Sequence, residues 1–350
     1  MTPAGGNWKE LYNAAQAGNL ALVKYHTENG IDIDYQHPEF LTTPLIASIE
    51  QERYEIAHFL LQNGASPTLK EIFGAQTPLL AAKATGNTRL VELIRSFLPK
   101  IPPKGLFITG HTGLLGQSVI RALEAKNWPI TVGSRKQPLS RGNLGWQHFD
   151  LDDRNTPQHL NGCDTLLHLA TNTDPKADSD IRGCKQLLSV ARKENIQKII
   201  YISIVGVDQV PLKYFKNKQR VEQLIQSSGI PYSILRATQF HAFFEQEVKK
   251  HLHKSFIIIP DLLYQPIATK VVAQKLIDLC QQPPINDITE IGGPTTISYR
   301  AAIQHYLTLN NQHKKVFSIP NFLLGKLGKA LTTAHKVRGG VTWYDYLESK

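Results

Sequence analysis

Three glycines at intervals of three residues limit the possible folds of this 350-residue chain more than any other feature does. Gly110, Gly113 and Gly116 follow an apolar run and open a helical stretch. In a strand–turn–helix unit, such glycines permit a tight turn, close approach of the backbone to a pyrophosphate, and packing of the helix on the strand. The helix N-terminus adds unpaired N–H groups and a positive dipole. We therefore predict a nucleotide-binding loop, with a purely structural turn as the alternative. The loop comprises Gly110, His111, Thr112, Gly113, Leu114, Leu115 and Gly116.

Apolar runs alternate with helical stretches around and beyond this loop. The run 199–205 (IIYISIV) is almost continuously apolar, which is typical of a strand buried on both faces. The predicted fold class is therefore α/β, with a doubly wound parallel sheet covered by helices. The predicted strands are 105–109, 130–133, 146–149, 165–169, 198–203, 232–235 and 256–259. The predicted helices are 113–126, 184–194, 214–227 and 270–281.

A repeat with a period of 34 residues organises the first hundred residues. Thr43-Pro44-Leu45 recurs as Thr77-Pro78-Leu79, and the small residues Ala14, Ser48 and Ala82 share the same register. Proline is tolerated at the first position of a helix, because its missing N–H would be unpaired there. Three units, each with two helices, indicate a stacked all-α solenoid.

These units resemble ankyrin repeats. TPLIASIEQERYEIAHFLLQNGAS and TPLLAAKATGNTRLVELIRSF follow the pattern of that family, whereas ELYNAAQAGNLALVKYHTENGID lacks the Thr-Pro start, as a capping repeat would. The resemblance implies a protein partner that binds to the repeats. A role in bracing the neighbouring domain is the alternative.

A proline-rich segment ends the helical period. Residues 99–103 contain three prolines, which favour a stiff, extended linker. We therefore expect ankyrin repeats over 1–98, a linker over 99–103, and a nucleotide-binding domain over 104–350.

Charge and cysteine content argue against several kinds of partner. The net charge is +10, but Lys and Arg are scattered, so we expect no nucleic acid. No apolar run is long enough to span a membrane, and no secretion signal is recognisable at the start. Cys163, Cys184 and Cys280 lack CxxC spacing, which indicates neither disulfides nor a metal site and favours a cytoplasmic location.

Residues 321–335 are predicted to form a packed helix of the substrate region, because a membrane-surface helix would need a denser basic face. We expect no membrane partner.

The end of the second strand indicates which nicotinamide cofactor binds. An NAD site usually has an acidic residue there, but this strand ends in Ser134 and Arg135. A guanidinium can hold a 2′-phosphate and stack on adenine, so NADP is favoured over NAD. Farther on, Asp150 and Leu151 follow the next short strand. An acid there can meet the adenine edge or cap a helix.

Several further segments carry a family resemblance: TGHTGLLG, SRK, DTLLHLAT, YISIVGVD, YFKNKQRVEQLIQSSGIPYSILRATQF and YQPIATKVVAQ. Together they resemble the NmrA-like branch of the atypical short-chain dehydrogenase/reductases. The resemblance implies a Rossmann domain, a smaller C-terminal substrate-binding region, and a cofactor across the strand ends. It places Leu169, Ala170 and Thr171 beside the nicotinamide ribose. Around the nicotinamide or the substrate cleft it places Arg236, Thr238, Gln239, Phe240, Gln265 and Pro266.

A serine, a tyrosine and a lysine form the catalytic hypothesis. Reductases of this superfamily use a tyrosine followed four residues later by a lysine, and Tyr214 and Lys218 have that spacing. A tyrosine needs a nearby ammonium to act near pH 7, because its ordinary pKa is about 10. Ser203, at the end of the preceding strand, would polarise the substrate carbonyl. The alternative is that Tyr214 only packs and Lys218 only contacts the nicotinamide ribose.

The sequence therefore predicts an NADP(H)-dependent oxidoreductase that transfers a hydride to a carbonyl, a quinone or a similar small electrophile. One alternative is a protein that senses NADP(H), with little turnover and an ankyrin module for a partner. Another is a nucleotide-sugar epimerase or dehydratase with tightly held NAD, against which Ser134 and Arg135 argue.

Overall fold

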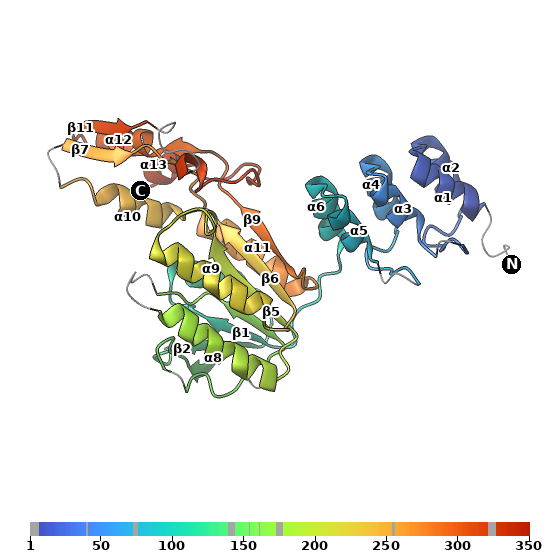
Figure 1. The fold of residues 1–350 in the computed structure, drawn as a ribbon, viewed down its shortest axis with the longest axis horizontal. Helices are drawn as coiled ribbons and strands as arrows, with labels where there is room; N and C mark the ends of the chain where they lie inside the picture. Colours follow the sequence, from blue (N-terminus) through green and yellow to red (C-terminus); the bar gives the residue numbers. More distant parts are fainter. Residues whose placement is uncertain are drawn as a thin grey trace. The chain divides into compact units, whose positions relative to one another are not determined.

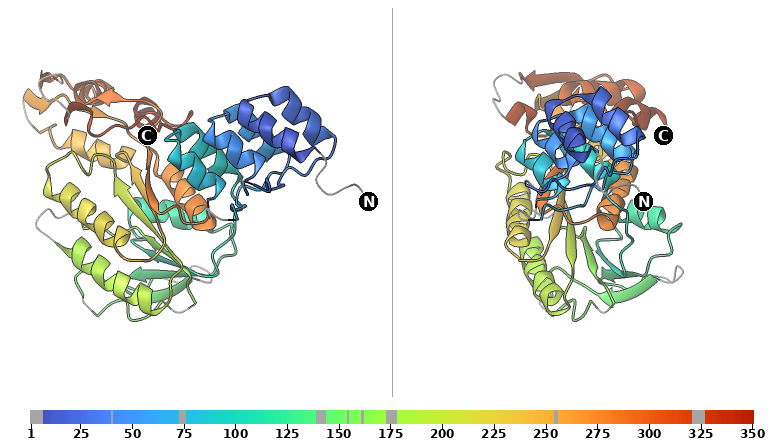
Figure 2. Two further views of the ribbon diagram at one scale, coloured as in Figure 1. Left: turned by 45° about the vertical axis from the view of Figure 1, so that its right-hand side comes forward. Right: turned by 90° about the vertical axis from the view of Figure 1, so that its right-hand side faces the viewer.

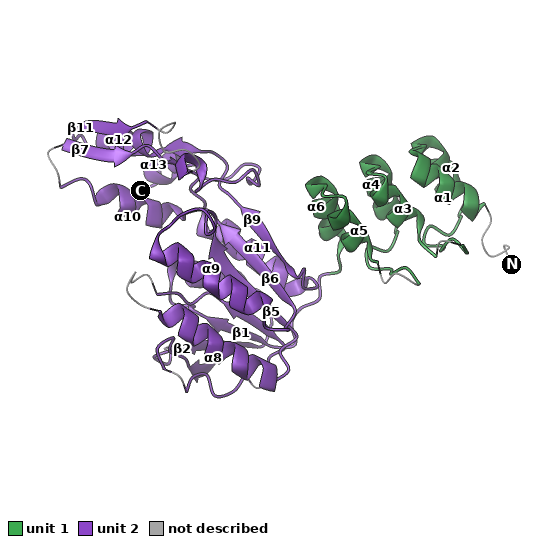
Figure 3. Ribbon diagram, in the orientation of Figure 1, with its two compact units in different colours: residues 1–99 green, residues 100–350 purple. Residues whose placement is uncertain are grey.

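The chain forms two compact units, Met1–Pro99 and Lys100–Lys350, coloured separately in Figure 3. The computed structural model describes residues 7–39, 41–72, 76–138, 144–153, 155–160, 162–172, 178–253, 256–320 and 327–350.

Paired short helices form the first unit (Figure 1). The Oγ1 atoms of Thr43 and Thr77 each accept a hydrogen bond from an N–H in the first helical turn, at 3.2 Å, and proline follows both threonines. These N-caps give the repeated Thr-Pro its physical basis. One apolar cluster runs through all the pairs. The helices are α1 (Trp8–Ala17), α2 (Leu20–Glu28), α3 (Pro44–Glu50), α4 (Tyr54–Gln62), α5 (Pro78–Ala84) and α6 (Thr88–Phe97).

A parallel sheet forms the centre of the second unit, with strand order β3-β2-β1-β4-β5-β6-β9. The chain begins in the middle, builds one half outward, and returns to build the other half, so the predicted doubly wound topology is confirmed. The order reverses between β1 and β4, where ligands bind in such sheets. The strands are β1 (Leu106–Thr109), β2 (Ile130–Ser134), β3 (Leu144–His148), β4 (Thr165–His168), β5 (Lys198–Ile204), β6 (Tyr232–Ala237) and β9 (Asp287–Ile291). The sequence prediction lacks β9, whose residues are largely polar.

Helices cover both faces of this sheet, as the right-hand view of Figure 2 shows. Alternation along β1 decides which side chain meets which layer: Leu106 and Ile108 join the cluster under α7 and α11, and Phe107 joins the cluster under α8 and α9. The helices are α7 (Leu114–Leu123), α8 (Ser179–Lys193), α9 (Lys213–Gln226) and α11 (Thr269–Gln281).

A smaller C-terminal region corrects two predictions. The predicted strand 256–259 exists as β7 but lies outside the main sheet, because it pairs with β11 alone. The predicted helix 321–335 is wrong over 327–335, which contain only a 3₁₀ turn at 327–329; its remainder lies outside the described residues. Gly328 and the paired threonines at 332 and 333 disfavour a helix there. The region contains α10 (His241–Lys249), β7 (Phe256–Pro260), β8 (Leu263–Tyr264), β10 (Ile297–Ser298), α12 (Tyr299–Leu309), β11 (Lys315–Ile319) and α13 (Trp343–Glu348).

The cysteines are free, and burial raises the pKa of the Cys184 and Cys280 thiols to about 12. A thiolate is the reactive form of cysteine, so neither thiol is suited to nucleophilic chemistry. Among the described helices, we find none with the length and apolar character that crossing a membrane requires.

Candidate cofactor and catalytic site

The glycine loop requires glycine at two positions. Gly110 has a φ of +72°, and a Cβ atom there would lie 2.5 Å from the Ala170 nitrogen. A Cβ atom on Gly116 would lie 2.2 Å from the Gly110 oxygen. Gly113 is different, because the nearest atom to its Cβ position is 3.5 Å away. The loop is therefore packed tightly against β4 and α7 on one side and has free space beside Gly113, at the start of α7.

A buried hydroxyl joins the glycine loop to the end of β4. Thr109 Oγ1 accepts hydrogen bonds from the N–H groups of Leu169 and Ala170, each at 3.2 Å, and lies 2.7 Å from His168 Nδ1. Because both lone pairs of the hydroxyl oxygen accept hydrogen bonds, the hydroxyl donates its own hydrogen bond to Nδ1 of His168. Burial, together with the nearby Lys218 ammonium, lowers the pKa of His168 to about 3, so its ring is neutral. Sequence reasoning missed these two residues because they lie inside an apolar run and a predicted strand.

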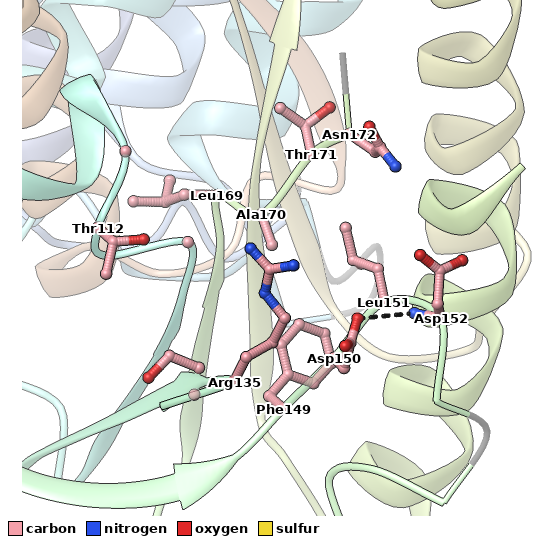
Figure 4. A pocket seen from close by; sticks show the side chains of 14 residues that line it. Thr112, Arg135, Phe149, Asp150, Leu151, Asp152, Leu169, Ala170, Thr171 and Asn172 are labelled. Carbon is pink, nitrogen blue, oxygen red and sulfur yellow. Dashed lines mark hydrogen bonds between the residues drawn. The ribbon is translucent and has the colours of Figure 1, made fainter. Parts of the chain in front are cut away.

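A cavity of about 360 Å³ opens beside the loop, and Figure 4 shows its walls. Its walls come from the glycine loop and from the carboxyl ends of β2, β3 and β4. Ten of the predicted cofactor residues line it: Gly110, Thr112, Gly113, Ser134, Arg135, Asp150, Leu151, Leu169, Ala170 and Thr171. The rest of the lining consists of Gly133, Phe149, Asp152 and Asn172.

Ser134 and Arg135 differ in how free they are to bind a ligand. The Ser134 hydroxyl donates to the Lys136 carbonyl at 2.7 Å and accepts from Trp146 Nε1 at 3.2 Å. Arg135 extends from the end of β2 into the cavity (Figure 4) and is exposed. No carboxylate of the described residues forms an ion pair with it. Arg135 is therefore the group that remains available to an anion at this end.

Asp150 does not cap a helix. Its Oδ1 accepts a hydrogen bond from the Asp152 N–H at 3.1 Å, which closes a short turn in the loop after β3 (Figure 4). Asp152 in turn forms an ion pair with Arg182 at 2.6 Å. Among the described residues no helix begins between β3 and α8, so the N-cap alternative for Asp150 is wrong.

His111, in the glycine loop, is half-buried. A backbone hydrogen bond with Gly133 opposes the effect of burial, but burial is the larger effect and lowers the pKa of the ring.

A second cavity, of about 240 Å³, shares Gly110, Gly113, Leu169 and Thr171 with the first. It brings together residues from the glycine loop, the end of β5, the start of α9 and the segment after β6. Its other lining residues are Leu114, Leu115, Gly116, Ile202, Ser203, Ile204, Tyr214, Lys218, Ala237, Thr238, Gln239, Phe240 and Phe243. The structure thus places the three predicted catalytic side chains at one cavity.

Ser203 and Lys218 are held in contrasting ways. Ser203 Oγ is buried and has no hydrogen-bond partner among the described residues. Lys218 is only 3% exposed; its Nζ donates to the Ile202 carbonyl at 3.3 Å and lies 4.9 Å from the centre of the Tyr201 ring. Tyr201 in turn stacks on His168, with ring centres 5.4 Å apart. The lysine ammonium is therefore fixed by a carbonyl and an aromatic face, one helical turn beyond Tyr214.

A buried carboxylate, which sequence reasoning missed, fixes the loop after β4. Asp180 on α8 accepts hydrogen bonds from the Thr171 hydroxyl and from the Asn172 N–H, both at 2.6 Å. Because Thr171 lines both cavities, Asp180 holds a wall that they share.

The residues expected at the substrate cleft divide into two groups. Gln239 and Phe240 line the second cavity, and neither polar side-chain atom of Gln239, both of them buried, has a partner in the part of the chain that the structure describes. Gln265 does not line it: its side chain donates to the Gly293 carbonyl and accepts from the Thr333 N–H, each at 2.8 Å. Arg236 is likewise occupied, in a two-pronged pair with Glu222 at 2.9 and 2.8 Å. These two residues join elements of the protein and do not face the cavity.

Two families match parts of the chain. Residues 110–283 match the family described as NAD(P)H-binding, and residues 11–61 match ankyrin repeats. Prestalk A differentiation protein A of Dictyostelium discoideum is 30% identical over 154 residues, which cover 42% of this chain and 48% of that protein. Photosystem II assembly factor Ycf39 of Cyanophora paradoxa is 26% identical over 148 residues, covering 39% and 45%. The chain thus spans less than half the length of each relative.

A solved structure shows the same fold. The Bordetella bronchiseptica enzyme WbmG, in complex with NAD and UDP, superposes with a TM-score of 0.55 at 14% sequence identity. The superposition covers 71% of this chain and 94% of that one.

Proposed function

Because the chain joins N-terminal ankyrin repeats to an NAD(P)H-binding Rossmann domain with NmrA-like relatives, we propose that it is an NADP(H)-dependent oxidoreductase. Its substrate is a carbonyl, a quinone or a similar small electrophile. The observation that carries the proposal is the cavity at which Ser203, Tyr214 and Lys218 meet the glycine loop.

The residues present fit a dinucleotide. Gly110 and Gly116 let the turn pack closely on the backbone around it, and free space lies beside Gly113 at the N-terminus of α7, where a diphosphate would bind. Arg135 would hold a 2′-phosphate, which supports NADP over NAD. Asp150 and Leu151 would line the adenine end of the first cavity.

When bound, reduced nicotinamide supplies the hydride. The chain's own groups handle the proton: the Tyr214 hydroxyl donates it to the substrate oxygen, and the Lys218 ammonium stabilises the resulting phenolate until solvent returns a proton. Ser203 Oγ, buried and unpartnered, donates a hydrogen bond to the same oxygen. Gln239 and Phe240 line the space left for the substrate.

Consumption of NADPH against a panel of quinones, aldehydes and ketones tests this proposal. We expect turnover in the wild type and a loss of roughly a hundredfold or more in Tyr214→Phe, which lacks the proton donor. The affinity for NADPH should be unchanged in that variant. Tight binding without consumption of NADPH in the wild type would instead support the sensing function.

A further inference from the structure

The two-stranded sheet β7–β11 exposes an apolar face to solvent. Phe256, Ile258, Phe317 and Ile319 are 58%, 59%, 54% and 47% exposed, and Pro260 is exposed beside them. In the sheet register, Ile258 lies opposite Phe317 and Pro260 lies opposite Ile319. These five side chains therefore form one continuous surface, which we call the outer apolar face.

Residues along β7 and β11 alternate between exposed and buried, so the exposure of this face follows from how the sheet packs. The intervening residues Ile257, Ile259 and Val316 are buried in a cluster that includes side chains of α10, α12 and α13. A half-buried sheet normally presents polar residues on its solvent side. Here both sides are apolar, and a contiguous exposed apolar surface of this kind marks an interaction site.

The segment that contains β11 carries charge of one sign. From Ile291 to Tyr344 the sequence contains no Asp or Glu, and within the described part of the chain its basic residues are Arg300, Lys314, Lys315, Lys329, Lys336 and Arg338. One of them, Lys315, lies on β11 directly opposite Phe256 and is exposed. The outer apolar face thus has a basic side chain at its Phe256 end, whereas Asp261 follows Pro260 at the other end.

We propose that the outer apolar face binds the surface of an anionic lipid bilayer. Its Phe and Ile side chains would enter the boundary between headgroups and acyl chains, and Lys315 would attract the anionic headgroups. A second copy of the chain is a poorer occupant, because the two basic segments would repel each other. A protein partner fits less well, because the basic residue on the face is Lys315 and protein interfaces are depleted in Lys.

This binding is independent of the proposed catalytic function, because none of the five residues lines either cavity. It departs from the expectation of no membrane partner, which rested on the lack of a spanning helix and of a basic amphipathic helix in the sequence. A sheet face with alternate residues exposed is recognisable only once the pairing of the strands is known.

Co-sedimentation of the full-length protein with lipid vesicles tests the proposal. We expect binding to phosphatidylcholine vesicles that contain phosphatidylglycerol to exceed binding to pure phosphatidylcholine by roughly tenfold, and to weaken at high salt. The double variant Ile258→Ser/Phe317→Ser should lose roughly tenfold or more of this binding, because it removes two side chains that would enter the lipid. Lys315→Glu should weaken binding to the anionic vesicles only.

The matched control is Ile101→Ser, which changes an isoleucine that is 64% exposed in the linker and should bind as the wild type does. Circular dichroism and NADPH affinity report whether each variant is folded; if the double variant is not, Lys315→Glu alone decides. Wild-type protein that fails to sediment with anionic vesicles would overturn the proposal, as would variants that bind undiminished. A concentration-dependent dimer that the double variant abolishes, without lipid binding, would assign the face to a second copy instead.

Discussion

At the scale of single residues, the site combines polar side chains that are hydrogen-bonded within the protein with a few that are buried and have no such partner among the described residues. The Thr109 hydroxyl donates one hydrogen bond and accepts two, which join β1 to the end of β4. Each carboxylate oxygen of Asp180 accepts a hydrogen bond from the loop after β4. Ser203 and Gln239 are buried at the cavity, and no described residue forms a hydrogen bond with their side chains. Unpaired buried polar atoms are costly, so their presence at this cavity is best explained by a ligand that pairs with them.

Arg135 should distinguish NADPH from NADH. We expect Arg135→Ala to weaken NADPH binding by roughly 10- to 100-fold, because a charge-assisted contact with the 2′-phosphate is lost, and to change NADH binding much less. Calorimetric titration of both cofactors measures the difference. Lys136→Ala removes the same charge from the next exposed residue and serves as the control. Equal losses for the two cofactors in Arg135→Ala would contradict the assignment.

Tyr201 should act as a positioning residue for Lys218. Tyr201→Phe keeps the aromatic face beneath the ammonium, whereas Tyr201→Leu removes it. We expect Tyr201→Leu, but not Tyr201→Phe, to lower the turnover of NADPH roughly tenfold and to move the pH profile of kcat. A purely structural role would lower the melting temperature and leave the pH profile in place.

At the scale of elements, packing decided what local patterns could not. β7 has the apolar composition of a strand in the central sheet, yet it pairs with β11 in a sheet of its own. β9 is largely polar, yet it completes the edge of the central sheet beside β6. In both cases the partner strand lies far away in the sequence, so the local sequence carries no record of the pairing.

Glu245 on α10 joins that helix to α13. Its nearly buried carboxylate contacts Lys249, Tyr346 and Lys350. Burial alone would raise the pKa of Glu245, but hydrogen bonds from these three groups outweigh it and hold the pKa at about 2. Because the folded-state pKa lies below the ordinary one, the carboxylate stabilises the fold above about pH 4.5, and this contribution is lost as the pH falls toward 2.

Glu245→Gln should therefore lower the melting temperature at pH 7, and its difference from the wild type should shrink below about pH 4.5. Thermal melting between pH 7 and 3 measures this. Glu247→Gln is the control, because it removes the same charge from the same helix. The ion pair that Glu247 forms is with Lys250. A pH-independent difference between Glu245→Gln and the wild type would contradict the assignment.

At the scale of the whole molecule, the two units have separate cores. The apolar cluster of the repeats contains only residues of the first unit, and the clusters around the sheet contain only residues of the second. The residues that line both cavities also come from the second unit alone. Cofactor binding should therefore not require the repeats.

Deletion of residues 1–98 should leave the NADPH dissociation constant within about twofold of that of the full chain, because no core or cavity is cut. Calorimetry on both proteins measures it. An insoluble or unfolded remainder would contradict this expectation and would support the view that the repeats brace the second unit.

The sequence by itself determined the nucleotide loop, the parallel sheet and the repeats, because each depends on short-range rules. Glycine at 110 and 116, proline after Thr43 and Thr77, and continuous apolar strands can each be interpreted from neighbouring residues alone. Only the tertiary structure decided which side chains meet. It removed Gln265 and Arg236 from the predicted cleft, because polar groups distant in the sequence occupy them. It likewise left the outer apolar face uncovered, because exposure of a strand depends on what packs against it.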